Sequence, residues 1–284
     1  YIVDSKTEAI FANFKYNISD QTFVQFGVRE QEITAYASNS FFLPLTALVG
    51  AADGGGSAFQ LIPATLQDLE NESTTGSFKI GHFVDDDVMV YFSLQQGFRG
   101  AGRTLANTPI SPALVPFLEE ETDMAEIGMK GTFLDGRLRL NFAYFDYTFD
   151  NFQRKWDDVT ARTYSAAGAG PTAQVQGGII NTNDASLTGM DIEYKYIVNE
   201  NLVLGGSITQ SESEFDAGSV GFTNDPSYDG MLAATKDVSG MPINDAAETS
   251  WTLYLDHTVP SYAGGERYTR YNINYRGERD QGVN

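Results

Sequence analysis

The stretch Gly189 to Phe215, GMDIEYKYIVNENLVLGGSITQSESEF, contains the pattern that decides the fold. In its first half charged residues alternate with an apolar and aromatic set, Met190, Ile192, Tyr194 and Tyr196. Successive side chains of a strand point to opposite faces, so one face of this segment is apolar and the other charged. After the turn residues Asn199 to Asn201 the alternation returns, with Leu202, Leu204 and Ile208 on one parity. The stretch therefore predicts a long β-hairpin with one apolar and one polar face.

Four further hairpins with the same alternation are expected along the chain. The first spans about residues 10–28 with a turn at Ser19 and Asp20, and the second spans about 78–94 around the acidic turn Asp85 to Asp87. A third, about 125–144, turns at Leu134-Asp-Gly-Arg137, and Asp-Gly between alternating arms is a strong hairpin signal. The last spans about 251–275. The chain thus contains about ten predicted strands.

The segments between these hairpins are long, and many are rich in Gly, Asn and Asp. We expect loops near residues 37–73, 100–121, 157–185 and 216–247. Within the first loop, the apolar patch Phe41 to Val49 is interpreted as a short packed helix, with a ligand contact as the alternative. Connections that alternate short and long are expected of an outer-membrane β-barrel, whereas a soluble sandwich gives no reason for them. The whole chain, 1–284, is therefore expected to be part of one such barrel.

Composition excludes several classes of protein. The 284 residues carry a formal net charge of -20, which argues against a nucleic-acid surface. Cysteine is absent, so a disulfide framework and thiolate metal sites are excluded. No apolar run approaches the roughly 20 residues that a membrane-spanning helix needs. The chain begins at Tyr1 without an initiator Met or a signal peptide, and we expect it to be a piece of a longer protein.

The charged residues of the predicted strands fit a membrane barrel. A Lys or Arg on the lipid face near the bilayer midplane costs roughly 2 to 4 kcal/mol. Five basic residues of these arms fall on the polar parity: Lys15, Lys130, Arg137, Arg139 and Lys195. Asp146 and Asp150 share the apolar parity, but they follow Tyr144, where the strand is expected to have left the bilayer. Aromatic residues near the strand ends suit interfacial girdles, with core packing as the alternative: Tyr16, Tyr194, Tyr196 and Trp251.

The sequence contains no recognisable catalytic or metal-binding motif. The carboxylates of Asp85 to Asp87 lack the ligand spacing of an EF-hand, so a solvated turn is favoured over calcium binding. The two histidines, His82 and His257, both lie toward short turns, a poor position for an enzyme that acts on extracellular substrates. We therefore predict no catalytic residue, no metal and no cofactor. A small barrel enzyme and a soluble carbohydrate-binding β-protein remain as alternatives.

Several spaced residues together resemble the C-terminal part of the β-barrel of TonB-dependent outer-membrane receptors. They are Gly97-Phe98-Arg99, Glu126-Ile127-Gly128 with Lys130, Leu140 to Phe145 followed by Gln153, Gly189 with Asp191 and Glu193, Asn201-Leu202 with Leu204-Gly205-Gly206, Glu214-Phe215, and Pro242 ahead of the Trp251 strand. Each is weak alone, but their order and separations cover nearly the whole chain. The chain departs from the family in having no plug sequence, no TonB-contacting segment and no final aromatic-ended strand. Pro242 also lacks the second proline that often follows it in the family.

The resemblance implies an all-β, antiparallel transmembrane β-barrel, here one part of a 22-stranded barrel whose plug domain is not in this chain. It implies TonB-dependent import of a scarce nutrient, with a ferric siderophore or similar iron complex favoured, across the outer membrane of a Gram-negative bacterium. A glycan or vitamin importer and a passive porin are alternatives. The implied partners are TonB through a plug segment, outer-membrane lipid, lipopolysaccharide and a small-molecule ligand, with no nucleic acid. The family expectation is a monomer.

Polar and aromatic residues at the loop bases are the candidate ligand contacts that follow from this resemblance. They are Arg99, Arg103, Arg154, Trp156 and Tyr164. Arginine suits an anionic ferric siderophore, and a stacked aromatic ring suits a sugar or a haem face. The alternative is that these arginines neutralise nearby loop carboxylates or bind lipopolysaccharide phosphates.

Overall fold

The computed structural model describes residues 2–38, 41–44, 59–62, 67–106, 113–156, 178–222, 235–243 and 247–278. Ten antiparallel strands form one sheet, and their order across the sheet is the same as their order along the chain. They are β1 (Ile2–Asn17), β2 (Thr22–Ser38), β5 (Gln67–Phe83), β6 (Val88–Arg99), β9 (Glu120–Phe133), β10 (Leu138–Asp150), β13 (Ala185–Asn199), β14 (Leu202–Phe215), β17 (Thr249–Pro260) and β18 (Glu266–Arg276). The described residues contain no helix long and apolar enough to cross a membrane.

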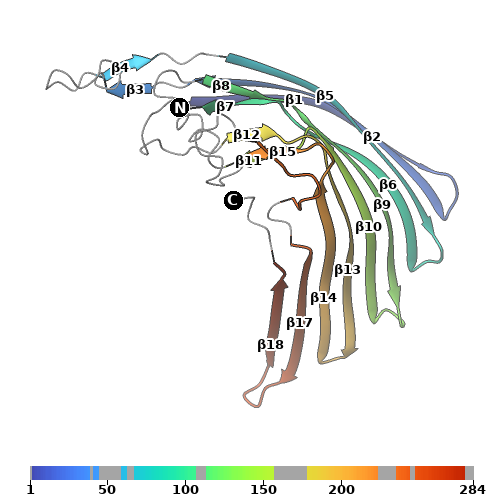
Figure 1. The fold of residues 1–284 in the computed structure, drawn as a ribbon. Coiled ribbons are helices and arrows are strands. Elements are labelled where there is room, and N and C mark those ends of the chain that lie inside the picture. Colours follow the sequence, from blue (N-terminus) through green and yellow to red (C-terminus); the bar gives the residue numbers. More distant parts are fainter. Residues whose placement is uncertain are drawn as a thin grey trace.

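Four two-stranded ribbons lie in the long connections. They are β3 (Phe41–Pro44) with β4 (Phe59–Ile62), β7 (Gly102–Ala106) with β8 (Ala113–Phe117), β11 (Gln153–Trp156) with β12 (Gly178–Asn181), and β15 (Val220–Phe222) with β16 (Thr235–Asp237). The sheet is strongly curved, and its short turns all lie at the end away from the ribbons (Figure 1). Short turns at one end and long connections at the other are the arrangement that the sequence predicts.

Each of the five hairpins expected from the sequence is present as a pair of antiparallel strands, with the apolar residues of its two arms on one face. In the decisive hairpin Ile192 faces Ile208, and in the first hairpin Phe14 faces Phe26. A slip of one residue would move every side chain of a strand to the opposite face, so the alternation excludes that slip. The third hairpin turns at Leu134 and Asp135, which both have positive φ, followed by Gly136 at φ 85°. That turn requires backbone conformations that Asp and Gly adopt more readily than bulky residues.

The connection after β2 differs from the prediction in two respects. The helix predicted to begin at Phe41 is wrong, because Phe41–Pro44 is a strand whose backbone pairs with Phe59–Ile62; residues 45–49 lie outside the described part. In addition, β5 already begins at Gln67, where the sequence QDLENES predicts a loop. This polar stretch is a strand because Gln67 to Ser73 pair with β2, from Ala37 to Gln31. Pairing with a neighbour holds the backbone extended where side-chain alternation is absent.

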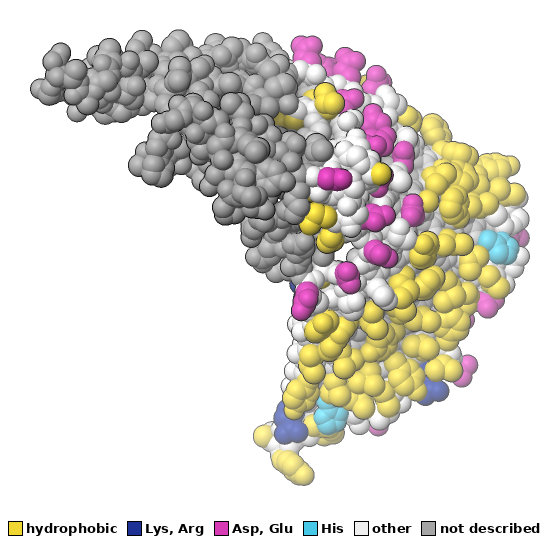
Figure 2. All heavy atoms as spheres, in the orientation of Figure 1, with side chains coloured by type: hydrophobic (Ala, Val, Ile, Leu, Met, Phe, Trp, Pro, Cys, Tyr) yellow, Lys and Arg dark blue, Asp and Glu magenta, His cyan; other side chains and the backbone are white. Residues whose placement is uncertain are grey.

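One face of the sheet carries a continuous belt of apolar side chains, which we call the apolar face. Rows of paired residues cross the strands, for example Phe92, Ile127 and Tyr144, and Ile192, Ile208 and Trp251. Several of these side chains are exposed although they are large and apolar; Ile127 is 56% exposed and Ile273 also 56%. Figure 2 shows the belt over the part of the strands nearer the short turns, with acidic side chains beyond it toward the long connections. An exposed belt of this kind is the surface that a barrel presents to lipid.

The other face, which we call the polar face, is packed by aromatic rings that lie over glycines of the neighbouring strand. Tyr91 lies over Gly128, Phe145 over Gly189 and Tyr254 over Gly205, so closely that a Cβ at each glycine would collide with the ring. Glycine is needed there because only a residue without a side chain leaves the room. These pairs bring Tyr91 and Phe145 to less than a tenth exposed on a face that otherwise carries polar groups.

Candidate functional site at the loop bases

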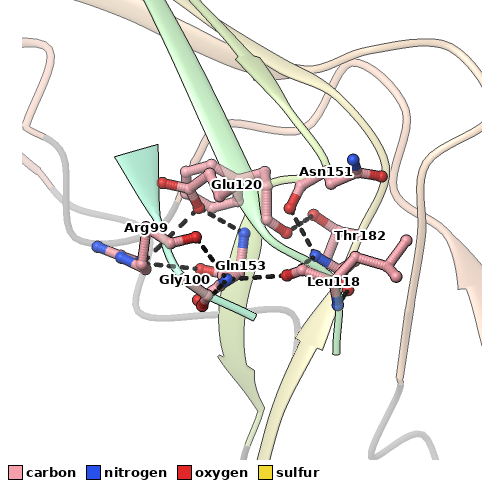
Figure 3. Close-up of polar contacts among 9 residues, drawn as sticks. Arg99, Gly100, Leu118, Glu120, Asn151, Gln153 and Thr182 are labelled. Carbon is pink, nitrogen blue, oxygen red and sulfur yellow. Dashed lines mark hydrogen bonds and ion pairs between the residues drawn. The ribbon is translucent and has the colours of Figure 1, made fainter. Parts of the chain in front are cut away.

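Gln153, the first residue of β11, connects the ends of three strands at the base of the long connections. Its backbone N–H donates to Oε2 of Glu120 at 2.6 Å, and its Nε2 donates to the carbonyls of Gly100 and Leu118, both at 2.9 Å. Gln153 is 5% exposed (Figure 3). Buried amides must have their hydrogen bonds made, so this residue holds β6, β9 and β11 in one arrangement.

Two asparagines continue this connection on either side. Asn181 on β12 accepts from the N–H of Leu118 and donates to the carbonyl of Asn151, each at 2.6 Å (Figure 3). Asn71 on β5 accepts from the N–H of Ala101 at 2.9 Å. Asn71, Gln153 and Asn181 therefore tie β5, the connection after β6 and the one after β10 to each other.

The fourth long connection is joined through Asp184. Its Oδ1 accepts from the N–H of Asn151 at 3.1 Å, and its carbonyl accepts from the N–H of Asp216 at 3.0 Å and from the hydroxyl of Ser219 at 3.2 Å. We call the four residues Asn71, Gln153, Asn181 and Asp184 the loop-base network. The connections after β6, β10 and β14 are thus linked to one another and to β5 through these residues.

Close to Asp184, the turn after β16 is held by Ser239. Its Oγ accepts from the N–H of Gly218 at 2.9 Å, and its own N–H donates to Oδ1 of Asp237 at 2.9 Å. Hydrogen bonds from the side chain and backbone of Ser239 favour the ionised carboxylate and lower the pKa of Asp237. This end of the fourth connection is therefore ordered by local polar contacts.

A small apolar cluster supports the same region from the polar face. Its buried members are Ala185, Phe215 and Val238, with Phe149 and Phe152 packed against them. The rings of Phe149, Phe152 and Phe215 meet edge to face, at centroid separations of 5.4 and 5.8 Å. Aromatic pairs of this geometry stabilise by about 0.5–1.5 kcal/mol beyond the area they bury.

Among the predicted ligand contacts whose side chains are described, Arg99 is the one that is exposed to solvent. Its side chain is 62% exposed, its Nη1 lies 3.7 Å from Oε2 of the nearly buried Glu120, and the same Nη1 donates to the carbonyl of Gln153 at 3.4 Å (Figure 3). A long contact between an exposed arginine and one carboxylate leaves further guanidinium donors for a ligand. Arg99 can therefore bind an anion without leaving its present position.

Arg154, the next predicted contact, has a different environment. It is 7% exposed, and its guanidinium carbon lies 5.1 Å from the centroid of the Phe215 ring. A planar guanidinium over an aromatic ring is a cation–π contact, and this one fastens β11 to the end of β14. Its contact with a ligand stays a prediction.

The remaining predicted contacts are placed by backbone only or not at all. Arg103 lies on β7 and Trp156 on β11, and the ribbon partner of β11, β12, lies against β7 and β8. The topology thus brings these two positions into neighbouring ribbons, but their side chains are outside the described part, as is all of Tyr164. Sequence reasoning did not single out Glu120, Asn181 or Asp184; single polar residues at the ends of strands carry no periodic signal.

The charges of the chain are divided between the two faces of the sheet. Toward the ribbons the apolar face is acidic (Figure 2). Its acidic residues there are Glu8, Glu30, Glu32, Glu70, Glu72, Glu121, Asp123, Asp146, Asp150, Glu212 and Glu214. On the polar face of the ten strands, basic residues (Lys15, Arg29, Lys79, Arg99, Lys130, Arg139, Lys195, Arg270 and Arg276) outnumber acidic ones (Glu120, Glu126, Asp191, Glu193, Asp256 and Glu266). A chain of net charge -20 therefore presents a mildly basic wall on one side.

The histidines and the acidic turn show no ligand-binding geometry. His82 and His257 lie on the apolar face near short turns, and Nδ1 of His82 is 2.9 Å from Oγ1 of Thr22. Asp85 accepts from the N–H of Asp87 at 2.8 Å, which closes the turn locally. Within the described ranges no three His, Cys, Asp or Glu side chains converge as a metal site would require.

A curved antiparallel sheet with an exposed apolar belt, a polar opposite face and long connections at one end defines part of an outer-membrane type of β-barrel. The chain belongs to the TonB-dependent receptor-like β-barrel family, whose family model matches residues 1–284. Structurally it is similar to the ferric yersiniabactin uptake receptor FyuA from Yersinia pestis, with a TM-score of 0.67, 15% identity and coverage of 97% of this chain and 34% of that one.

Other solved structures share the fold with similarly low sequence identity. The alcaligin outer-membrane receptor FauA from Bordetella pertussis gives a TM-score of 0.58 at 15% identity, with 97% of this chain and 38% of that chain covered. The copper transporter OprC gives 0.59 at 10% identity, with 90% and 34% covered. The chain thus spans about a third of the length of these structures. Among curated proteins, none matches the chain. The family consists of receptors and transporters.

Proposed function

We propose that the protein containing this chain imports a ferric siderophore or a similar iron complex across the outer membrane, with energy delivered through TonB. The observation that carries the ligand class is the division of charge between the two faces. Carboxylates lie on the outward face near the rim, while the wall that faces the lumen is mildly basic and ends in the accessible Arg99. An anionic ligand is repelled outside the barrel and attracted inside it.

The loop-base network adds to this proposal. Ligand-binding loops work best when a rigid scaffold fixes their ends. Asn71, Gln153, Asn181 and Asp184 join β5 to the bases of the connections after β6, β10 and β14, so the end of β6 that carries Arg99 is held in place. TonB would act through a plug segment outside this chain, and the receptor would work as a monomer surrounded by outer-membrane lipid and lipopolysaccharide.

The proposal is tested by measuring uptake of ⁵⁵Fe from a panel of ferric chelates by cells that carry the complete receptor. We expect saturable uptake of at least one anionic chelate that disappears in cells lacking TonB. Uptake that continues without TonB would point to a passive porin instead. Uptake of glycans or vitamins in place of iron chelates would show that the receptor imports another class of ligand.

A matched pair of variants locates the contact. Arg99→Gln removes the guanidinium at the rim, and we expect the apparent affinity for the chelate to fall by about tenfold. Arg267→Gln removes the same charge on the apolar face of β18, next to the short turn, and should leave uptake unchanged. If both variants lose the same affinity for the chelate, or if Arg99→Gln loses none, Arg99 does not contact the ligand.

A further inference from the structure

A pocket of about 460 Å³ lies on the polar face of β10, β13, β14 and β17, four strands that run side by side near their short turns (Figure 1). Two rows of paired residues cross it. The row nearer the turns runs through Arg139, Lys195, Gly205 and Tyr254, and the next row runs through Asn141, Glu193, Ser207 and Thr252. The pocket therefore has a basic side and, next to it, a side of hydrogen-bonding groups.

The basic side of the pocket brings two like charges together. Arg139 and Lys195 are direct partners in the register of β10 and β13, and both residues are exposed. Like charges directly opposite each other destabilise a sheet. Within the described part of the chain, neither residue makes an ion pair. An anionic oxygen group between the two side chains would offset their repulsion and accept charge-assisted hydrogen bonds from both.

The next row offers an acceptor that is held in place. Oε2 of the exposed Glu193 accepts from Nδ2 of Asn141 at 3.2 Å, and the hydroxyl of Thr252 donates to Oδ1 of Asn274 at 2.9 Å. An ionised carboxylate has acceptor capacity beyond a single bond. Glu193 therefore repels a bare anion but attracts a hydroxyl or amide N–H donor on the same ligand.

The far wall of the pocket is an aromatic ring that is fixed from below and from the side. Tyr254 packs over Gly205, and the guanidinium carbon of Arg270 lies 5.3 Å from the centroid of its ring. Arg270 itself donates two hydrogen bonds to the carboxylate of Asp256, both at 2.6 Å. The shape of this wall is therefore set before any ligand binds.

The pocket and Arg99 lie at opposite ends of the same wall. Arg139 pairs with Thr132 and Arg99 pairs with Glu120, and both partners belong to β9. About 12 residues of strand separate these partners, which corresponds to roughly 40 Å. One small chelate cannot contact both places at once, so the pocket is separate from the contact at the rim.

We propose that this pocket is a second anion site, which binds a carboxylate group with a neighbouring hydroxyl or amide N–H and holds the imported chelate before it leaves toward the periplasm. Arg139 and Lys195 bind the carboxylate, and Glu193 accepts from the neighbouring donor. Short turns of such barrels face the periplasm, which places the pocket at the exit end. This inference rests on the proposed import of an anionic chelate and adds a site to it.

The first test is isothermal titration calorimetry of the complete receptor with citrate, whose carboxylates adjoin a hydroxyl. The variant Arg99→Gln serves as the parent, so that the rim does not contribute to binding. We expect citrate to bind this parent, and adding Lys195→Gln should weaken binding by about tenfold. Lys15→Gln, the same change on the polar face of β1 outside the pocket, is the control and should leave binding unchanged. Tricarballylate, which is citrate without the hydroxyl, should bind more weakly than citrate.

Three results of this titration would contradict the proposal: no binding of citrate to the parent, unchanged binding after Lys195→Gln, or equal affinities for citrate and tricarballylate. If citrate does not bind and Lys195→Gln lowers the unfolding temperature, an acidic side chain of the same polypeptide fills the pocket instead. Heat-modifiable gel migration checks that every variant is folded, which we expect because Lys195 is exposed.

Uptake of ⁵⁵Fe tests the role of the site in transport. With Arg99 intact, Lys195→Gln should lower the maximal rate of uptake, because the chelate reaches the pocket after it leaves the rim. The affinity of the chelate at the cell surface, measured in cells lacking TonB, should stay unchanged. A lower surface affinity or an unchanged maximal rate would overturn this role. If the wild type imports no anionic chelate, the proposed function fails, whereas the citrate titration decides by itself whether the pocket binds an anion.

Discussion

At the scale of single residues, the bases of the long connections are held by side chains that the periodicity of the strands does not predict. Gln153 makes contacts with residues up to 54 positions away in the sequence. The cross-strand glycines are the second case, because their need for space comes from the ring of a neighbouring strand. Both kinds of residue give predictions that can be measured on single variants of the complete receptor.

The first prediction concerns Gln153. Replacement by Ala removes this donor from the carbonyl of Gly100 and leaves the carbonyl of Leu118 with only Nδ2 of Asn181 at 3.1 Å, and losing such a partner costs about 1–3 kcal/mol. We expect faster hydrogen exchange in the segment 99–120, measured by mass spectrometry, with the strands near the short turns unchanged. Gln25→Ala, which changes an exposed glutamine on the polar face of β2, is the control. Unaltered exchange in 99–120 would mean that Gln153 does not hold the loop bases.

The second prediction concerns Gly128. A Cβ there would lie 2.5 Å from the ring of Tyr91 and 2.7 Å from the backbone oxygen of Phe142, which cannot move away. Gly128→Ala should lower the free energy of unfolding by about 1–3 kcal/mol, as overpacking typically does. Gly97→Ala, whose nearest contact would be 3.5 Å from Thr122 Cβ, should be tolerated. Urea-induced unfolding of the two variants in detergent compares them, and equal stability would refute the steric argument.

At the scale of strands, each hairpin combines an alternating segment with a polar extension toward the ribbons. The alternating part can be recognised from its own residues, because period two reflects contact with lipid on one face and water on the other. The polar extension, such as QDLENES in β5, is recognised only through its partner strand. The length of each strand therefore depends on its pairing with the neighbouring strand and not only on its own sequence.

The third prediction tests the two faces within one strand. Leu253 lies in the belt between Gly206 and Ile273 and is 40% exposed, whereas Thr252 faces the polar side and its hydroxyl donates to Asn274. Leu253→Lys should cost roughly 2–4 kcal/mol near the bilayer midplane, and Thr252→Lys much less. The folded fraction after insertion into lipid vesicles measures the difference. Similar yields for both variants would contradict the assignment of the lipid face.

At the scale of the whole molecule, the ten-stranded sheet has two edges, β1 and β18, each paired on one side only among the described residues. Open edges are not stable in the hydrocarbon of a bilayer, because their N–H and C=O groups would lack partners. The chain spans about a third of the length of the related structures. Further strands of the same polypeptide are therefore expected to pair with both edges.

The fourth prediction follows from these edges. The polypeptide extracted from native outer membranes should have an intact mass well over twice the 31.1 kDa of this chain. Intact-mass spectrometry of the detergent-extracted protein measures it directly. A mass near 31 kDa would require this sheet to close by itself, and the small barrel enzyme would then become the leading alternative.

The sequence by itself determined the antiparallel hairpins, the short turns and the division between an apolar and a polar face. These features depend on residues only one, two or a few positions apart in the sequence, so the periodicity and the turn residues are enough to predict them. The resemblance implied that Arg99 lies at a loop base, where its side chain is exposed, and its contact with a ligand stays a prediction. Only the tertiary structure decided that Arg154 is buried over Phe215, that β7 lies beside β12, and that Gln153, Asn181 and Asp184 join the loop bases. Those contacts join residues dozens of positions apart, and the pairing of neighbouring strands, rather than any local pattern, brings them together.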